Sequence, residues 1–260
     1  GAHQWAGLNQ PGRAGQKPFF ALLLLEQTGL YGTFTALNFF HWFIFWEVSL
    51  VPMFFLIKLY GNENRTRASY QFFVYTFVGS VMMLIGMQFV YLATGSWDLP
   101  ALAGMAREAS GQTGQLVLAV KIQDFAGTLG VPFLTKHSVS LIFFLVFAGF
   151  AVKVPLWPFH TWLPVTYTEA PTAGSMLLTG VMSKMGVYGF LRVVLPLFGS
   201  SVSEYRDILL LLAVATILLG TIAALAQRDL KTMIAYSSVN HLGFCLLGIF
   251  AVAVGAGAAN

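Results

Sequence analysis

The sequence predicts an all-α protein, a polytopic bundle of about seven transmembrane helices, one of them broken by proline. Two features indicate this fold class. Hydrophobic residues make up 57% of the 260 residues and charged residues only 9%, whereas soluble domains average about 25% charged residues. The apolar residues also form runs of about 20, the length that crosses a bilayer as a helix. We expect residues 1–260 to form a single membrane domain that is a fragment of a longer polytopic chain.

The predicted spans follow one another closely, except for a long polar segment at 95–137. The middle of that segment, QLVLAVKIQDF, fits a short strand or an interfacial helix, and the sequence leaves both open. The spans are predicted at residues 18–36, 37–59, 70–94, from 138 onwards, and at 171–198, 208–226 and 233–254.

The fourth span runs into the segment KVPLWPFHTWLP. Pro155, Pro158 and Pro164 lack backbone N–H groups, so they interrupt the helix. Because an unpaired carbonyl group is costly in lipid, broken helices persist only where protein or a water-filled cavity surrounds them. We therefore expect this segment to face away from lipid. At the following kink, we expect Glu169 and Thr172 to cap the next helix.

Basic residues outside the spans divide unequally between the two ends of the predicted bundle. By the positive-inside rule, the end that carries more of them faces the cytoplasm. This rule assigns the N-terminal end of the segment to the cytoplasmic side. The richer end carries Arg13, Lys17, Lys58, Arg65, Arg67, Arg228 and Lys231, and the poorer end carries Arg107, Lys121, Lys136 and Arg206.

Charged residues lie inside otherwise apolar spans at Glu47, Lys153 and Lys184. A charge at mid-bilayer costs about 3 kcal/mol even on lenient scales, so such residues usually have a function. We predict a relay that carries protons across the membrane. Glu47 and Lys153 are hypothesised to form a pair whose separation favours release of the lysine proton. The alternative is a static ion pair that locks helix packing.

Lys184 has no acidic partner in its own span, which favours transport over a static pair. It is flanked by Gly180, Gly186 and Gly189, and small residues allow close helix approach and leave room for water. The alternative is a lysine that extends its head group to the membrane interface.

His160 and His241 are candidate intermediate stations, because an imidazole both accepts and donates protons near neutral pH. For each, a hydrogen-bonded packing role is the alternative. A second carboxylate, Glu26, fits either a point of proton uptake or a structural residue bonded to Tyr31, Gln27 or a neighbouring helix. The structural role is favoured for Glu26.

The sequence offers no conventional redox centre. Cys245 is the single cysteine, whereas iron–sulfur clusters and structural zinc sites usually need four ligands. We find no P-loop or dinucleotide-binding glycine pattern, and no Lys/Arg cluster dense enough to follow nucleic-acid phosphates. We therefore expect no cofactor, metal or nucleic acid on this chain.

Long blocks of the sequence match one family in register. The strings FWEVSLVPMFFLI, AVKVPLWPFHTWLPVTYTEAPTAGSMLLTGVMSKMGVYGFLR and RDLKTMIAYSSVNHLGF resemble the antiporter-like membrane subunits of respiratory complex I, in the chain M or chain 4 variant. The resemblance implies two inverted repeats of five helices, each with a discontinuous helix. It assigns residues 18–198 to the first repeat and 208–254 to the first two helices of the second.

The resemblance also implies proton translocation coupled to quinone reduction, in a bacterial cytoplasmic membrane or an equivalent energy-converting membrane. Its partners would be the lipid bilayer and other membrane subunits, while NADH or another donor, FMN, iron–sulfur clusters and quinone would bind to partner subunits. The chain departs from the family at Val165 and Asn38, where acidic residues are usual. By motif, the relay residues would be Glu47, Lys153, Lys184, His241 and His160.

Other functions share this fold and these residues. One alternative is a subunit of a multi-subunit cation/proton antiporter, and another is a membrane subunit of a membrane-bound hydrogenase-type complex. The EAPT form of the kink favours the quinone-linked function. A membrane scaffold with purely structural charges is the remaining alternative.

Overall fold

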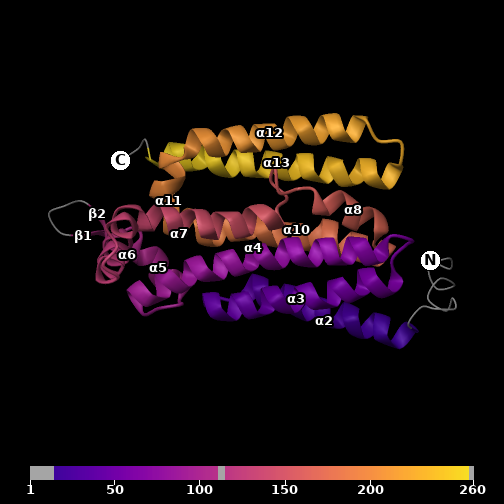
Figure 1. Ribbon diagram of the computed structural model, residues 1–260, viewed down its shortest axis with the longest axis horizontal. Helices are drawn as coiled ribbons and strands as arrows, with labels where there is room; N and C mark the ends of the chain where they lie inside the picture. Colours follow the sequence, from indigo (N-terminus) through magenta and orange to yellow (C-terminus); the bar gives the residue numbers. More distant parts are fainter. Residues whose placement is uncertain (1–14, 111–114, 258–260) are drawn as a thin grey trace.

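The computed structural model describes residues 15–110 and 115–257, which form an elongated bundle of helices (Figure 1). The α2–α3 pair forms one side, the α12–α13 pair forms the other, and α4, α7 and α10 lie between them. The helices are α2 (Gln16–Thr35), α3 (Phe39–Tyr60), α4 (Arg65–Thr94), α5 (Leu99–Met105), α6 (Val117–Thr128), α7 (Pro132–Lys153), α8 (Trp162–Glu169), α9 (Thr172–Leu177), α10 (Ser183–Gly189), α11 (Leu195–Glu204), α12 (Arg206–Leu225) and α13 (Leu230–Gly257).

Within the described ranges, six helices are long and apolar enough to cross a membrane. The sequence also predicts a span at 18–36, and this segment does form α2, a helix of 20 residues. It is less apolar than the other six, so a seventh span stays a prediction. The six are Phe39–Tyr60, Arg65–Thr94, Thr135–Lys153, Thr172–Glu204, Arg206–Leu225 and Leu230–Val252.

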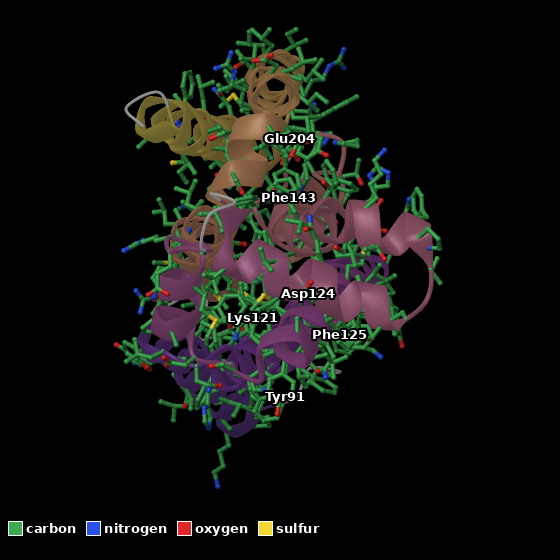
Figure 2. The ribbon with its side chains drawn as sticks, turned by 90° about the vertical axis from the view of Figure 1, so that its left-hand side faces the viewer. Tyr91, Lys121, Asp124, Phe125, Phe143 and Glu204 are labelled. Atoms are coloured by element: carbon green, nitrogen blue, oxygen red, sulfur yellow. The ribbon has the colours of Figure 1, made fainter. Side chains whose placement is uncertain are left out.

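The polar segment at 95–137 closes one end of the bundle. Strands β1 (Ala109–Ser110) and β2 (Gln115–Leu116) pair antiparallel, and β2 leads directly into α6. QLVLAVKIQDF therefore begins as a strand and continues as a helix. Figure 2 looks onto this end and shows α6 lying across it, with Lys121 and Asp124 labelled along the helix. Residues spaced by four positions form its buried face: Leu118, Ile122 and Ala126.

The predicted break in the fourth span is confirmed. Helix α7 ends at Lys153, and α8 begins at Trp162. Polar groups replace some of the helical hydrogen bonds that the break removes: the Trp162 indole N–H donates to the Val152 carbonyl (2.9 Å), and the Trp157 N–H donates to Thr216 Oγ1 (2.9 Å). A broken helix is tolerated here because neighbouring elements satisfy its backbone.

The prediction that the broken segment faces away from lipid is correct for only part of it. Val154 and Leu156 are fully buried, but Trp157 and Phe159 are exposed, at 39% and 36%. The segment turns outward after Leu156 and returns to the interior at Trp162, so only its middle lies on the surface of the described chain.

The fifth span is longer than predicted: helical structure extends over Thr172–Glu204, with a kink at Phe198. Two π-helical segments, η2 (Leu178–Met182) and η3 (Phe190–Val194), flank α10. Wide turns of this kind alter the pattern of carbonyl groups along a helix and occur often at functional sites. They bracket Lys184, the charged residue of this span.

The expected caps at the kink before this span are wrong. No side chain caps the start of α9. The Glu169 carboxylate instead accepts hydrogen bonds from the Asn64 N–H (3.1 Å) and the Asn64 side-chain amide (3.4 Å). The extended backbone at Ala170 turns the chain away from the line of α8. Glu169 therefore fixes α8 to the turn between α3 and α4.

The basic residues used for the orientation lie at opposite ends of the bundle. The α3–α4 and α12–α13 turns share one end with the start of α2, whereas α5, α6 and the start of α12 lie at the other (Figure 1). Arg13 falls outside the described residues. The grouping fits the predicted topology; which end faces the cytoplasm stays a prediction.

Candidate functional site

The Lys153 ammonium group lies deep inside the bundle. Lys153 is the last residue of α7 and is 2% exposed. Its Nζ atom has no hydrogen-bond partner among the described residues, but it lies over the rings of Trp46 (5.2 Å to the centroid) and Phe72 (5.7 Å). Aromatic faces and the negative end of a helix dipole both stabilise a cation. Neither neutralises it, so the ammonium depends on buried carboxylates.

Glu47, the predicted partner, is half-buried on α3 beside Trp46. Its carboxyl group lies near the Ser80 side chain of α4 and interacts electrostatically with Lys153. The Oε1 atom is buried without a hydrogen-bond partner in the described part of the chain. The two groups thus belong to one site, but no direct ion pair joins them; among described residues, the ion pair found is Arg206–Asp207.

For Glu26 the sequence leaves a proton-uptake role and a structural role open, and the structure adds the surroundings of its carboxyl group. It is fully buried on α2, and neither carboxyl oxygen has a hydrogen-bond partner among the described residues. Tyr31, one of its expected partners, is 65% exposed. Lys153 interacts electrostatically with both carboxyl groups, Glu26 and Glu47.

Helical spacing was the signal that could have placed Glu26 inside the bundle. Positions 19, 26, 30 and 33 lie on one face of a helix. The residues at these positions, Phe19, Glu26, Leu30 and Thr33, are all buried. Gln27 and Tyr31 point outward.

Lys184 lies in a different environment, on the surface of the described chain. Its ammonium group donates a hydrogen bond to the Thr179 carbonyl in the π-helical segment η2, and the Ser183 hydroxyl donates to the same carbonyl (3.2 Å). Lys184 also lies near Cys245, an exposed residue of α13. The wide turn supplies a carbonyl that an ordinary helical turn would bond to an N–H group.

A close helix approach connects the two lysine sites. A Cβ atom on Gly186 would lie 2.5 Å from Val154 Cγ2 and 3.3 Å from Lys153 Cβ. Gly189 similarly faces the Phe150 ring, whereas Gly180 has no heavy atom within 4 Å of such a Cβ position. The expected role of small residues in close packing therefore applies to Gly186 and Gly189, and Gly180 borders open space.

The two histidines lie in separate places. His160 is half-buried in the break between α7 and α8, where its Nδ1 atom has no hydrogen-bond partner in the described chain. Its ring centroid is 6.4 Å from that of Tyr236 on α13. His241 is exposed on α13, one helical turn before Cys245. Since Cys245 neighbours Lys184, His241 and Lys184 border the same side of the molecule.

Aromatic side chains enclose the Lys153 site. Trp42, Trp46 and Trp162 are at most 2% exposed, so they pack inside the bundle. Phe150 contacts two of them edge-on, at centroid distances of 5.5 Å from Trp42 and 5.8 Å from Trp46. These rings exclude water from one side of the ammonium group and strengthen its electrostatic interactions.

The fold and the site together define a class of protein. Discontinuous helices and unpartnered ionisable residues inside a bundle are the features of membrane proteins that move ions. No group of three or more His, Cys, Asp or Glu residues suited to a metal ion occurs in the described ranges.

Residues 36–259 match the family described as NADH:quinone oxidoreductase/Mrp antiporter, transmembrane, and the chain belongs to this family. It is 38% identical over 234 residues to NADH-quinone oxidoreductase subunit M of Rickettsia felis, covering 90% of this chain and 42% of the relative. It is 40% identical over 232 residues to F(420)H(2) dehydrogenase subunit M of Methanosarcina mazei, covering 88% and 43%.

Solved structures share the fold. Respiratory complex I from Thermus thermophilus with bound NADH contains a chain with a TM-score of 0.71 and 30% identity, covering 90% of this chain and 44% of that one. The Mrp complex from Dietzia sp. DQ12-45-1b gives a TM-score of 0.71 at 23% identity, over 88% and 38%, which supports the fold alone. The chain spans about two fifths of the length of the curated relatives it matches.

Proposed function

We propose that this chain is part of a proton-translocating membrane subunit of a complex I-like enzyme that passes electrons from NADH or another donor to quinone. The observation that carries the proposal is the Lys153 ammonium group. It is buried at the end of a broken helix, has no hydrogen-bond partner among the described residues, and interacts with carboxylates on α2 and α3. A purely structural lysine would gain stability from direct hydrogen bonds, which this one lacks.

The proposed mechanism uses the distance between Lys153 and its carboxylates. A buried ammonium group is stabilised mainly by nearby negative charge. When Glu47 is close, Lys153 holds its proton; when a helix shift or a field change separates them, the proton becomes easier to release. The α-helix of α7 ends at Lys153, and discontinuous helices provide such movement in other transporters.

Lys184 is the proposed next station. Helix α10 packs directly on the end of α7 at Gly186, so the proton would pass between neighbouring helices. His241 would then continue the path along α13, and His160 would connect the break to the same side. We assign 18–198 to a first five-helix repeat and 208–254 to the start of a second.

The redox cofactors are assigned to partner subunits. Relatives with similar identity are named for NADH-quinone oxidoreductase and for F(420)H(2) dehydrogenase, so the electron donor varies while this segment is retained. That variation supports a chain that moves protons and leaves NADH, FMN, iron–sulfur clusters and quinone to its neighbours. The basic end of the bundle supports a cytoplasmic N-terminal end, in a bacterial cytoplasmic membrane or an equivalent one.

A cation/proton antiporter subunit is the second candidate, because the family includes Mrp antiporters and the Mrp complex shares the fold. A membrane-bound hydrogenase-type complex would place the same segment beside a different redox unit. The relatives at 37–40% identity favour a function linked to a redox enzyme, since their names specify NADH-quinone oxidoreductase or F(420)H(2) dehydrogenase. Sodium-driven proton exchange without any redox activity would favour the antiporter.

The test replaces Lys153 with Met in the full-length subunit, within its complex. We expect proton translocation in sealed vesicles to fall by about a hundredfold, the lower range for loss of a positioned proton-transfer group. Assembly should be retained, because Met keeps the volume of the side chain. Glu47→Gln should give a smaller loss. Normal pumping by both variants would refute the relay.

A further inference from the structure

The Lys153 site contains one more carboxyl group than a single ion pair requires. Glu26 and Glu47 lie on different helices, and both interact with the one ammonium group. One positive charge neutralises one carboxylate. A second ionised carboxylate in this apolar interior would be an unpaired buried charge, which proteins avoid by protonation. The site therefore holds a proton on one of its two carboxyl groups.

The burial of Glu26 shows that it belongs to this site rather than to the surface. Its side chain is fully buried, and neither carboxyl oxygen meets a hydrogen-bond donor in the described chain. Neither solvent nor a structural hydrogen bond explains the residue. Buried polar groups are normally satisfied, so an unsatisfied carboxyl group points to a function that needs it free.

The backbones that carry the two carboxyl groups are held firmly together. A Cβ atom on Gly29, one turn after Glu26, would lie 2.7 Å from the Ser49 N atom of α3. The Tyr188 hydroxyl also donates to the Phe34 carbonyl (3.2 Å), which ties α10 to α2. The four-carbon side chain of Lys153 is consequently the flexible part of the site, and Lys side chains reorient readily.

We propose that Glu26 is a second, alternating counter-ion of Lys153 and carries the exchangeable proton of the site. In one state, Lys153 is an ammonium paired with ionised Glu47, and Glu26 is protonated. After Lys153 passes its proton onward, the neutral amine turns to Glu26. The O–H bond of Glu26 breaks, its proton moves to the amine, and the new ammonium pairs with the Glu26 carboxylate. Glu47, which has then lost its ammonium partner, takes up a proton from the uptake side, so one of the two carboxyl groups stays protonated. This inference rests on the proposed proton translocation and adds the group that reloads the lysine.

The test compares Glu26→Gln, Glu26→Leu and the double variant Glu26→Gln/Glu47→Gln in the full-length subunit within its complex. Proton translocation is measured in sealed vesicles, and assembly by the amount of intact complex. Gln27→Ala is the matched control, because Gln27 lies beside Glu26 in the sequence but points outward. Glu26→Leu separates packing from chemistry, since an apolar side chain fills the same buried space.

We expect Glu26→Gln and Glu26→Leu to assemble normally and to pump about tenfold more slowly, a modest share of what a positioned proton donor contributes. The double variant should lose translocation almost completely, because neither counter-ion remains. Glu26→Asp should restore most of the rate, and Gln27→Ala should match the unaltered protein. Infrared difference spectra should lose a protonated-carboxyl band in Glu26→Gln.

Normal pumping by Glu26→Leu would overturn the inference, as would a double variant no slower than Glu47→Gln alone. Failure of all Glu26 variants to assemble, Asp included, would assign Glu26 a structural role and also overturn it. The Lys153→Met variant separates the two proposals. If Lys153→Met abolishes pumping while Glu26 variants pump normally, only the role of Glu26 is refuted; if Lys153→Met pumps normally, the relay itself is refuted.

Discussion

Lys153 and Lys184 are the same residue type on two helices that touch, yet their surroundings differ sharply. Lys153 is buried among aromatic rings, has no hydrogen-bond partner among the described residues, and faces two carboxyl groups. Lys184 is exposed on the described chain and donates to a backbone carbonyl in a π-helical turn. The first depends on charges that move relative to it, whereas the second is held by a fixed dipole.

This difference suggests a division of labour. A buried amine whose only counter-charges are carboxylates changes its proton affinity strongly when those groups move, because the local dielectric is low. An amine held by a backbone carbonyl and open to solvent changes much less. Lys153 therefore suits the switch, and Lys184 suits a relay station with a steady affinity.

The largest expected effect that tests this difference between the two lysines is a loss of proton translocation when Lys184 is replaced. In the full-length subunit, Lys184→Ala should lower proton translocation by about tenfold, less than Lys153→Met, because a relay station has alternatives that a switch lacks. Translocation is measured in sealed vesicles beside donor:quinone activity. Lys184→Arg is the matched variant, since it keeps the charge but cannot release a proton. Lys184→Arg should pump as slowly as Lys184→Ala. Normal pumping by Lys184→Arg would show that Lys184 contributes only its positive charge.

The second largest expected effect is a loss of stability at the contact between α10, which carries Lys184, and the end of α7, which carries Lys153. Gly186→Val should destabilise the protein by about 1–3 kcal/mol, because the new side chain would enter the space of Val154 and Lys153. Thermal unfolding of the purified full-length protein measures this loss. Gly180→Val is the control, since a Cβ atom there meets nothing within 4 Å. Equal stability of the two variants would show that α10 does not pack on α7 as described.

The smallest effect concerns α13, which carries His241 beside the Lys184 region. The Thr232 N–H and hydroxyl donate to the Asp229 carboxylate just before the helix, at 2.9 and 2.8 Å, and hold its pKa below the ordinary value of 3.8. A lowered pKa in the folded state stabilises the protein above the unfolded pKa, and the gain is lost as pH falls through the folded pKa. Asp229→Ala should lower the melting temperature slightly near pH 7.

The same variant should show a pH dependence. The difference in melting temperature between Asp229→Ala and the unaltered protein should shrink as pH falls below 3.8, where the unaltered carboxylate takes up a proton. Asp124→Ala is the control, because Asp124 is exposed on α6 (Figure 2). A difference that stayed constant with pH would contradict the proposed hydrogen bonding of the carboxylate.

The sequence was sufficient to predict the helices and the break. Hydrogen bonds within a helix join residues four positions apart, so helix formation depends on neighbours along the chain. The apolar runs therefore predicted six of the spans, and Pro155 predicted the end of α7 close to Lys153. The motifs around Glu47, Lys153 and Lys184 also identified the family, since they lie in continuous stretches of sequence.

The tertiary structure alone decided which groups share an environment. Glu26 faces Lys153 because α2 packs on α3 with a particular face inward, and Glu169 binds Asn64 because the chain turns at Ala170. The exposure of Lys184 likewise depends on which helices cover α10. These outcomes depend on contacts between residues far apart in the chain. The packing of one helix on another decides which face of each helix turns inward, and a short stretch of sequence does not determine that packing.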